Sequence, residues 1–161
     1  MKKFNCAIIL PTESPIAYCT SLELTEKLID MVKNKNFDTF YFWTLKGMNI
    51  VAFNTLYLLK KQYDIKLIFT VGNMVDECGY QTQYCQRTRD VFDEVIIHKR
   101  CLDIKESIFE NNLVEKGLIE LADYVLMETI ELRLRDYAEN INKPIIFVRS
   151  CGTENLSYYR F

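Results

Sequence analysis

The stretch that decides the fold runs from Thr39 to Gly72 and reads TFYFWTLKGMNIVAFNTLYLLKKQYDIKLIFTVG. It contains an apolar run typical of a buried strand, a turn with a single glycine (Gly47), a helical pattern and a second apolar run. This order predicts a βαβ unit with two parallel strands. Ligands of open α/β sheets bind at the carboxyl ends of the strands, so the Gly47 turn lies at the expected binding edge.

Short apolar runs alternate with amphipathic stretches along the rest of the chain. The patterns predict strands at 5–10, 40–43, 65–71, 94–97, 124–127 and 144–148, and helices at 20–33, 48–60, 81–92, 104–122 and 130–138. Thr20 and Glu23 fit a capping box at the start of the first helix. The alternation predicts one α/β domain over residues 1–161, with a doubly wound, mostly parallel sheet, helices on both faces and a Rossmann-like architecture.

Composition and charge exclude several classes of function. The net charge is −2 and the basic residues are scattered, which argues against nucleic acid as a partner. The six cysteines form no C-x-x-C pair and His98 is the only histidine, so we expect no metal site, no cofactor and reduced thiols. No apolar run approaches the ~18 residues of a membrane span and no signal peptide is visible, so we expect a cytoplasmic protein with no membrane partner.

Several common site motifs are missing from the sequence. No G-x-G-x-x-G follows the first strand, which argues against a standard dinucleotide site. No G-x-x-x-x-G-K-[ST] is present, which excludes a P-loop nucleotidase, and no acidic pair closes the first strand as in a phospho-receiver domain. A serine triad would need to include His98, and no G-x-S-x-G accompanies it.

Five segments in a fixed order resemble the SMF/DprA–LOG (SLOG) superfamily, and most of all its YpsA-like branch. They are TLKGMNIVA at 44–52, QYDIKL at 62–67, FDEVI at 92–96, LIELADYVL at 118–126 and KPII at 143–146. The resemblance covers roughly residues 38 to 148. It implies a SLOG-like sheet and a nucleotide-related ligand.

The chain departs from the pattern of that family at its glycine-rich site. The first turn glycine of the family falls at Thr44, its acidic residue at Asn49, and its basic–Asn pair near Val114 and Glu115. The family's phosphate-binding G-G-T turn has no counterpart, since Met127 to Ile130 reads METI. Such a turn supplies backbone N–H groups to a phosphate. A degenerate site is therefore expected.

The candidate ligand-binding residues follow the ends of the first three strands. They are Thr12, Glu13, Thr44, Lys46, Gly47, Asn49, Gly72 and Asn73. Gly47 either only makes the turn or lets a ligand approach the backbone. Asn49 either caps the helix or hydrogen-bonds a ligand. The basic cluster His98–Arg100 either holds an anion or is a solvated turn, and the run Phe40–Trp43 is expected to be sheet core.

Three functions remain open from the sequence. The first is a domain that binds a small nucleotide- or nucleoside-related molecule without turnover. The second is an N-glycosidase or nucleotide phosphoribohydrolase, for which Glu13 and Glu128 are candidate carboxylates by position. The third is an oligomeric scaffold without a working site. The aromatic tail Tyr158–Phe161 favours burial against this domain or a second subunit, so we expect a homo-oligomer.

Overall fold

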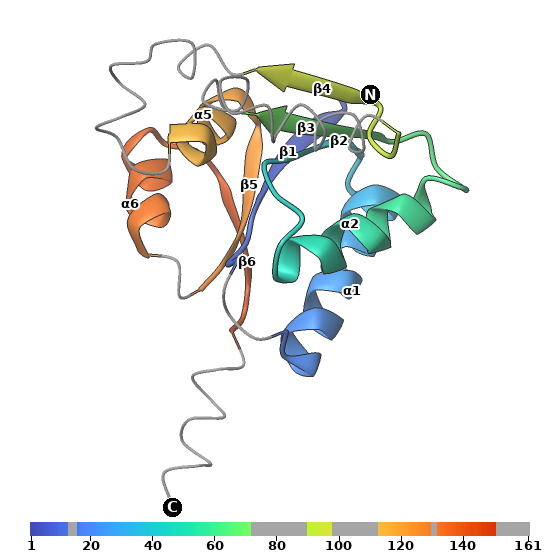
Figure 1. Ribbon diagram of the computed structural model, residues 1–161, viewed down its shortest axis with the longest axis horizontal. Coiled ribbons are helices and arrows are strands. Elements are labelled where there is room, and N and C mark those ends of the chain that lie inside the picture. Colours follow the sequence, from blue (N-terminus) through green and yellow to red (C-terminus); the bar gives the residue numbers. More distant parts are fainter. Residues whose placement is uncertain (13–15, 72–89, 98–112, 130–131, 151–161) are drawn as a thin grey trace, which may run out of the picture.

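The computed structural model describes residues 1–12, 16–71, 90–97, 113–129 and 132–150, and within these ranges it shows one six-stranded sheet (Figure 1). The strands are β1 (Phe4–Ile9), β2 (Phe37–Phe42), β3 (Lys66–Val71), β4 (Glu94–Ile97), β5 (Tyr124–Glu128) and β6 (Ile145–Val148). The helices are α1 (Tyr18–Asn34), α2 (Met48–Leu59), α5 (Leu113–Leu121) and α6 (Leu132–Asn140). All strand pairings are parallel, in the order β4-β3-β2-β1-β5-β6.

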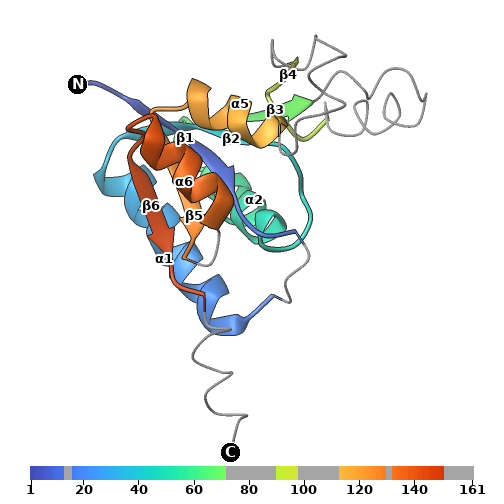
Figure 2. The same ribbon diagram turned by 90° about the vertical axis from the view of Figure 1, so that its left-hand side faces the viewer.

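The sheet lies between two layers of helices. In Figure 1, α1 and α2 cover one face and α5 and α6 cover the other, and Figure 2 looks onto the second of these faces. The chain moves outward from β1 to β4 and then returns to the far side of β1 to form β5 and β6. This reversal is the defining feature of a doubly wound sheet, so the predicted α/β, Rossmann-like architecture is confirmed.

The apolar strands supply a core on both faces of the sheet. In β1, Cys6 and Ile8 belong to the cluster under α1 and α2, while Ala7 and Ile9 belong to the cluster under α5 and α6. Successive side chains of a strand point to opposite faces, so a central strand with two covered faces must be apolar throughout. This explains why β1 reads as a continuous apolar run.

Two helix boundaries predicted from the sequence are wrong. The predicted capping box at Thr20 does not form, because α1 begins one turn earlier, with Ala17 as N-cap and no side-chain cap. The N–H of Ser21 donates to the carbonyl of Ala17 at 2.9 Å and closes the first turn there. Thr20 is instead buried inside the helix.

The predicted helix at 81–92 is also wrong where it can be compared, because residues 90–92 form a turn and bend rather than a helix. Phe92 leads into β4 and packs its ring against Phe42, Phe53 and Phe69, with centroids 4.9 to 5.7 Å apart. Aromatic pairs of this kind stabilise the structure beyond the apolar area that they bury. Residues 81–89 and 98–112, where the rest of two predicted helices fall, lie outside the described residues.

Two of the cysteines bear on the expectation of reduced thiols. Cys6 is a free thiol, and its burial raises the pKa far above the ordinary value. The expectation of reduced thiols is wrong at Cys19, which is disulfide-bonded, and the other half of that bond lies outside the described residues.

Within the described ranges, no helix combines the length and apolar character that crossing a membrane would need.

Aspartates fix the strand register at the amino edge of the sheet. The Asp93 carboxylate, just before β4, accepts from the backbone N–H of Leu67 in β3 at 2.8 Å and pairs with Lys60. Asp123, just before β5, accepts from the N–H of Asn5 at 3.1 Å and returns its own N–H to the Asn5 side chain. A one-residue slip would break these bonds and turn the apolar side chains to the wrong face.

The Asp93 contact predicts a pH-dependent stability. Burial alone would raise the pKa of Asp93, but the Leu67 N–H and the Lys60 ammonium together hold the pKa below its ordinary value. Because the folded state has the lower pKa, the charge stabilises the fold above about pH 4, and this stabilisation disappears as the pH falls through the lowered pKa. We expect Asp93→Asn to lower the free energy of unfolding by about 1 kcal/mol at pH 7.

Urea unfolding at pH 7 and at pH 3 checks this expectation. The difference in unfolding free energy between wild type and Asp93→Asn should be smaller at the lower pH. The matched control, Asp136→Asn at an exposed position, should change the unfolding free energy little at either pH. A gap for Asp93→Asn that is independent of pH would contradict the ion pair.

Candidate functional site

The candidate site lies at the carboxyl edge of the sheet, where β1 and β5 are neighbours and the chain direction across the sheet reverses. Loops leave such a point toward opposite faces, and the space between them is the usual ligand site of this architecture. On one side of this point lie the segments after β1 and β2. On the other lie the ends of β5 and β6.

Gly47 allows the segment after β1 to approach the turn after β2. Its φ of 61° and ψ of −138° lie in a region that is essentially restricted to glycine. A Cβ at this position would come within 2.4 Å of the Pro11 carbonyl oxygen and 2.9 Å of the Thr12 carbonyl oxygen. Glycine is therefore required here for the turn and for close approach of the chain itself, and approach by a ligand remains a prediction.

Asn49 ties the same two segments together. Its side-chain amide donates to the carbonyls of Leu10 and Lys46, each at 2.9 Å, and its side-chain oxygen accepts from the N–H of Leu10 at 3.3 Å. The residue is fully buried, and both of its amide hydrogens are used. The expected helix cap is wrong, because Gly47 is the N-cap of α2 and Asn49 lies inside the helix. Its contact with a ligand remains a prediction.

The other predicted rim residues divide into those the structure places and those it does not describe. The buried Thr44 accepts from the N–H of Lys46 at 3.2 Å, and the Lys46 side chain is exposed. Thr12 is half-buried beside Gly47. The structure thus brings together Thr12, Thr44, Lys46, Gly47 and Asn49. The remaining predicted positions, Glu13, Gly72, Asn73 and the cluster 98–100, lie outside the described residues.

The role of Asn49 as a donor to two carbonyls can be tested by changing one atom. Asn49→Asp keeps the acceptor for Leu10 but sets a carboxylate oxygen against the carbonyls of Leu10 and Lys46. Because both donated bonds are lost and a buried charge faces two carbonyls without a cation, we expect a loss of about 3 kcal/mol or more in unfolding free energy. The matched control is Asn140→Asp at the exposed end of α6, which should cost at most about 1 kcal/mol. Equal losses in urea titrations would contradict the contact.

A buried carboxyl group lies on the other side of the switch point. Glu128 ends β5, and only 3% of its surface is exposed. Burial raises the pKa of its carboxyl group, and a hydrogen bond with the Ser150 side chain offsets only part of that effect. A carboxyl group with a raised pKa at the ligand edge can act as a hydrogen-bond partner or as an acid. The sequence nominated Glu128 by position alone.

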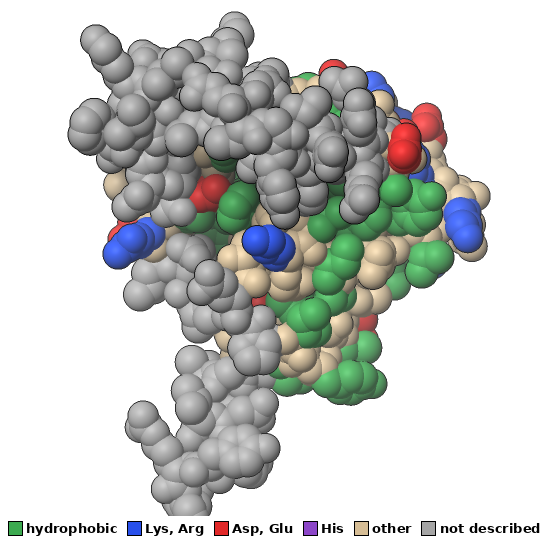
Figure 3. Space-filling model, viewed as in Figure 1, with side chains coloured by type: hydrophobic (Ala, Val, Ile, Leu, Met, Phe, Trp, Pro, Cys, Tyr) green, Lys and Arg blue, Asp and Glu red, His purple; other side chains and the backbone are tan. Residues whose placement is uncertain are grey.

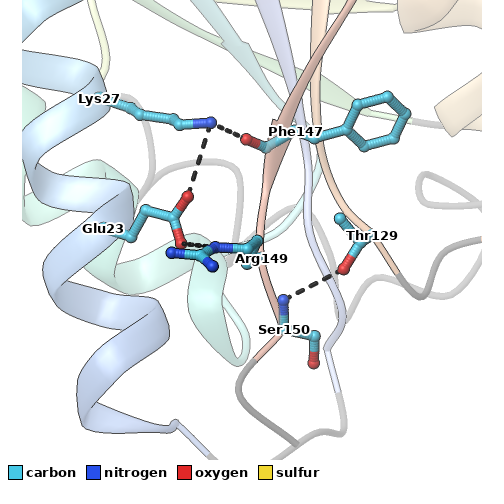
Figure 4. Close-up of polar contacts among 6 residues, drawn as sticks. All are labelled: Glu23, Lys27, Thr129, Phe147, Arg149 and Ser150. Atoms are coloured by element: carbon cyan, nitrogen blue, oxygen red, sulfur yellow. Dashed lines mark hydrogen bonds and ion pairs between the residues drawn. The ribbon is translucent and has the colours of Figure 1, made fainter. Parts of the chain in front are cut away.

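Thr129 and Ser150 join the ends of β5 and β6 beside that carboxyl group. The Thr129 N–H donates to the Val148 carbonyl at 3.1 Å, and the Ser150 N–H donates to the Thr129 hydroxyl at 3.2 Å (Figure 4). The first bond continues the parallel ladder one step past the strands, and the second ties the next residue to a side chain. They hold the Ser150 side chain where it reaches Glu128.

A charged cluster that the sequence analysis did not predict connects α1 to β6 (Figure 4). The Lys27 ammonium donates to the Phe147 carbonyl, and the Glu23 carboxylate lies 3.7 Å from both Lys27 and Arg149. The Glu23–Lys27 spacing of four residues was visible as an ordinary helix pair. Its contact with β6 was not, because that depends on strand order. One carboxylate thus lies between two cations next to the candidate site.

The raised pKa of Glu128 predicts that a neutral replacement stabilises the protein. The folded state binds the Glu128 proton more tightly than the unfolded state, so any destabilisation is absent below about pH 4 and develops as the pH rises through the raised pKa. We expect Glu128→Gln to unfold at a higher temperature than wild type at pH 8 and at the same temperature at pH 4. A variant that is less stable at pH 8 would contradict the assignment.

Comparisons with known proteins do not assign this chain to a family. A scan against models of known protein families found no match, and a search of curated protein sequences found no significant match. The structure itself shows a parallel, six-stranded Rossmann-like sheet, the coarser part of what the SLOG resemblance implies. Among the described residues, no group of three or more His, Cys, Asp and Glu side chains could hold a metal ion.

Proposed function

We propose that this protein binds a small, anionic, nucleotide- or nucleoside-related molecule at the carboxyl edge between β1 and β5. The observation that supports this most directly is the start of α1. This 17-residue helix begins behind β1 with Ala17 as N-cap, without a side-chain cap and without an acidic residue in its first turn. Alanine is among the poorest N-cap residues. Among the described residues, no carboxylate caps the positive end of this helix dipole, which lies at the carboxyl edge of the sheet.

The start of α2 has the same character. Its N-cap is Gly47, no side chain caps it, and its first turn also lacks an acidic residue. The exposed Lys46 stands immediately before it. Two helix N-termini and a lysine thus favour negative charge at the same edge of the sheet. This arrangement could replace the missing G-G-T turn as the anchor of a phosphate group.

Glu128 supports the nucleoside part of the proposal. A carboxyl group beside the switch point can accept hydrogen bonds from sugar hydroxyls or from an exocyclic amine, as acidic residues in dinucleotide-binding sheets do with the ribose. The resemblance to the SLOG superfamily points to the same class of ligand. The backbone of Thr12 lies beside the Gly47 turn, and in this proposal its hydroxyl contributes to the rim.

Two substitutions at Ala17 test the proposal in opposite directions. Serine is a good N-cap without charge, so Ala17→Ser should raise the unfolding free energy by about 0.5–2 kcal/mol and leave ligand binding nearly unchanged. Ala17→Asp should stabilise the free protein similarly, but its carboxylate occupies the anion position and should abolish binding of phosphate-bearing molecules. The probes are AMP, adenosine and ribose 5-phosphate.

Thermal unfolding with and without each probe gives the readout. A ligand at 100 times its dissociation constant adds about 2.7 kcal/mol to the unfolding free energy. A shift with AMP in wild type and Ala17→Ser, but not in Ala17→Asp, supports a phosphate at this helix. No shift with any probe, or the same shift in both variants, would overturn the proposal for this position.

The buried Glu128 also favours a second candidate, an N-glycosidase or phosphoribohydrolase. In that reaction a carboxylic acid can protonate the leaving base, or a carboxylate can activate the attacking water. Release of free adenine from AMP by the wild type, abolished in Glu128→Gln while AMP still stabilises the variant, would support this activity. Binding without release would leave the first proposal in place.

A further inference from the structure

The amino-acid composition of α2 does not suit a helix that faces water. Its sequence, MNIVAFNTLYLL, contains no charged residue over twelve positions. The inward side packs on the sheet through Met48, Ala52, Phe53 and Leu56, all buried. A helix that is hydrophobic all round is normally buried, and in α2 only uncharged polar residues interrupt the apolar ones. By contrast, α1 covers the same face of the sheet and carries five charged residues along its length.

The side of α2 away from the sheet forms an uncharged stripe, which we call the α2 outer face: the partly buried Ile50 and the exposed Asn54, Tyr57 and Leu58. The spacing of four, three and one residues places them on one side of a helix. Leu58 is 61% exposed and Tyr57 is 44% exposed. The Tyr57 ring stacks on that of Phe53 with centroids 5.6 Å apart, so it is held in place from below.

This face is part of a wider apolar surface. Figure 3 shows hydrophobic side chains gathered over the α1 and α2 side of the molecule. The exposed apolar residues near the start of α1 are Ile16, Tyr18 and Leu22. Single exposed apolar residues are ordinary, but a gathered surface of this kind marks an interaction site.

We propose that the α2 outer face is the interface of a homodimer, in which two copies of α2 pack antiparallel across a two-fold axis. In such an interface each residue meets the same surface of the second copy, so a charge near the axis would face a like charge. The α2 outer face has none. Asn54, at its centre, carries a donor and an acceptor and can pair with its own copy.

Along the described segment around α2, the nearest charged residues in sequence lie beyond the two ends of the helix. Lys46 precedes α2, and Lys60 and Lys61 follow it. Packed helices cross at an angle and diverge away from their closest point, so these lysines fall at the solvated rim. Lys60 is moreover paired with Asp93 of its own chain. The distribution of charge is thus that of a neutral centre with a polar rim.

The proposed antiparallel packing predicts that Ile50 of one copy contacts Leu58 of the other. Ile50 and Leu58 lie four residues on either side of Asn54, so in antiparallel packing about Asn54 each Leu58 meets Ile50 of the other copy. Either Leu58→Glu or Ile50→Lys alone should separate the dimer, because it buries an unpaired charge. The double variant carrying Ile50→Lys and Leu58→Glu should recover the dimer through two ion pairs across the axis.

Sedimentation equilibrium on the full chain from about 1 to 100 μM measures the mass in solution over the concentration range of ordinary dimers. The matched control is Leu121→Glu, since Leu121 is 45% exposed on α5, across the sheet. We expect a dimer for wild type, Leu121→Glu and the double variant, and a monomer for each single variant, with circular dichroism spectra unchanged.

Three outcomes would overturn the proposal. They are a wild-type monomer at about 100 μM, a dimer that survives both single variants, and a double variant that stays monomeric. The second outcome, combined with loss of the dimer on deleting residues 156–161, would assign the interface to the aromatic tail instead. None of these results depends on the ligand proposed for the carboxyl edge.

Discussion

The carboxyl edge of this sheet depends on one buried amide. Asn49 binds the backbone of Leu10 and Lys46, and so fixes the segment after β1 against the turn after β2. The close approach of the two segments requires a residue without a side chain at Gly47, because a Cβ there would lie only 2.4 Å from the Pro11 carbonyl oxygen. Since α2 begins directly at the turn that the amide binds, the direction in which α2 points its amino end is set by the amide as well. The proposed anion site is a consequence of that arrangement.

Much of the fold was predictable because it depends on local apolar patterning. Burial on both faces makes central parallel strands apolar throughout, and the predicted positions of all six strands overlap the observed ones. The turn at Gly47 was visible for the same reason, as a single glycine between a strand and a helix. The shifts at strand ends, such as Trp43 falling outside β2, reflect hydrogen bonding to neighbours rather than hydropathy.

The chemistry of the edge was harder to predict, because it depends on contacts between distant segments. The partners of Asn49 include a residue 39 positions away, and no periodic pattern encodes that pairing. The start of α1 was misplaced because Thr20 and Glu23 have the right spacing for a cap, while burial draws Thr20 into the helix. The raised pKa of Glu128 arises from burial that only the strand order creates.

The two edges of the sheet differ in what their residues do. At the amino edge, Asp93 and Asp123 each bind the second residue of a neighbouring strand and so hold the register of the sheet. Those bonds lie away from the carboxyl ends of the strands. A sheet whose register is held in this way could carry segments of different length or sequence at its carboxyl edge and keep its alignment. The scaffold is therefore a suitable host for loop grafting, and selectivity could diverge at one edge while the frame stays constant.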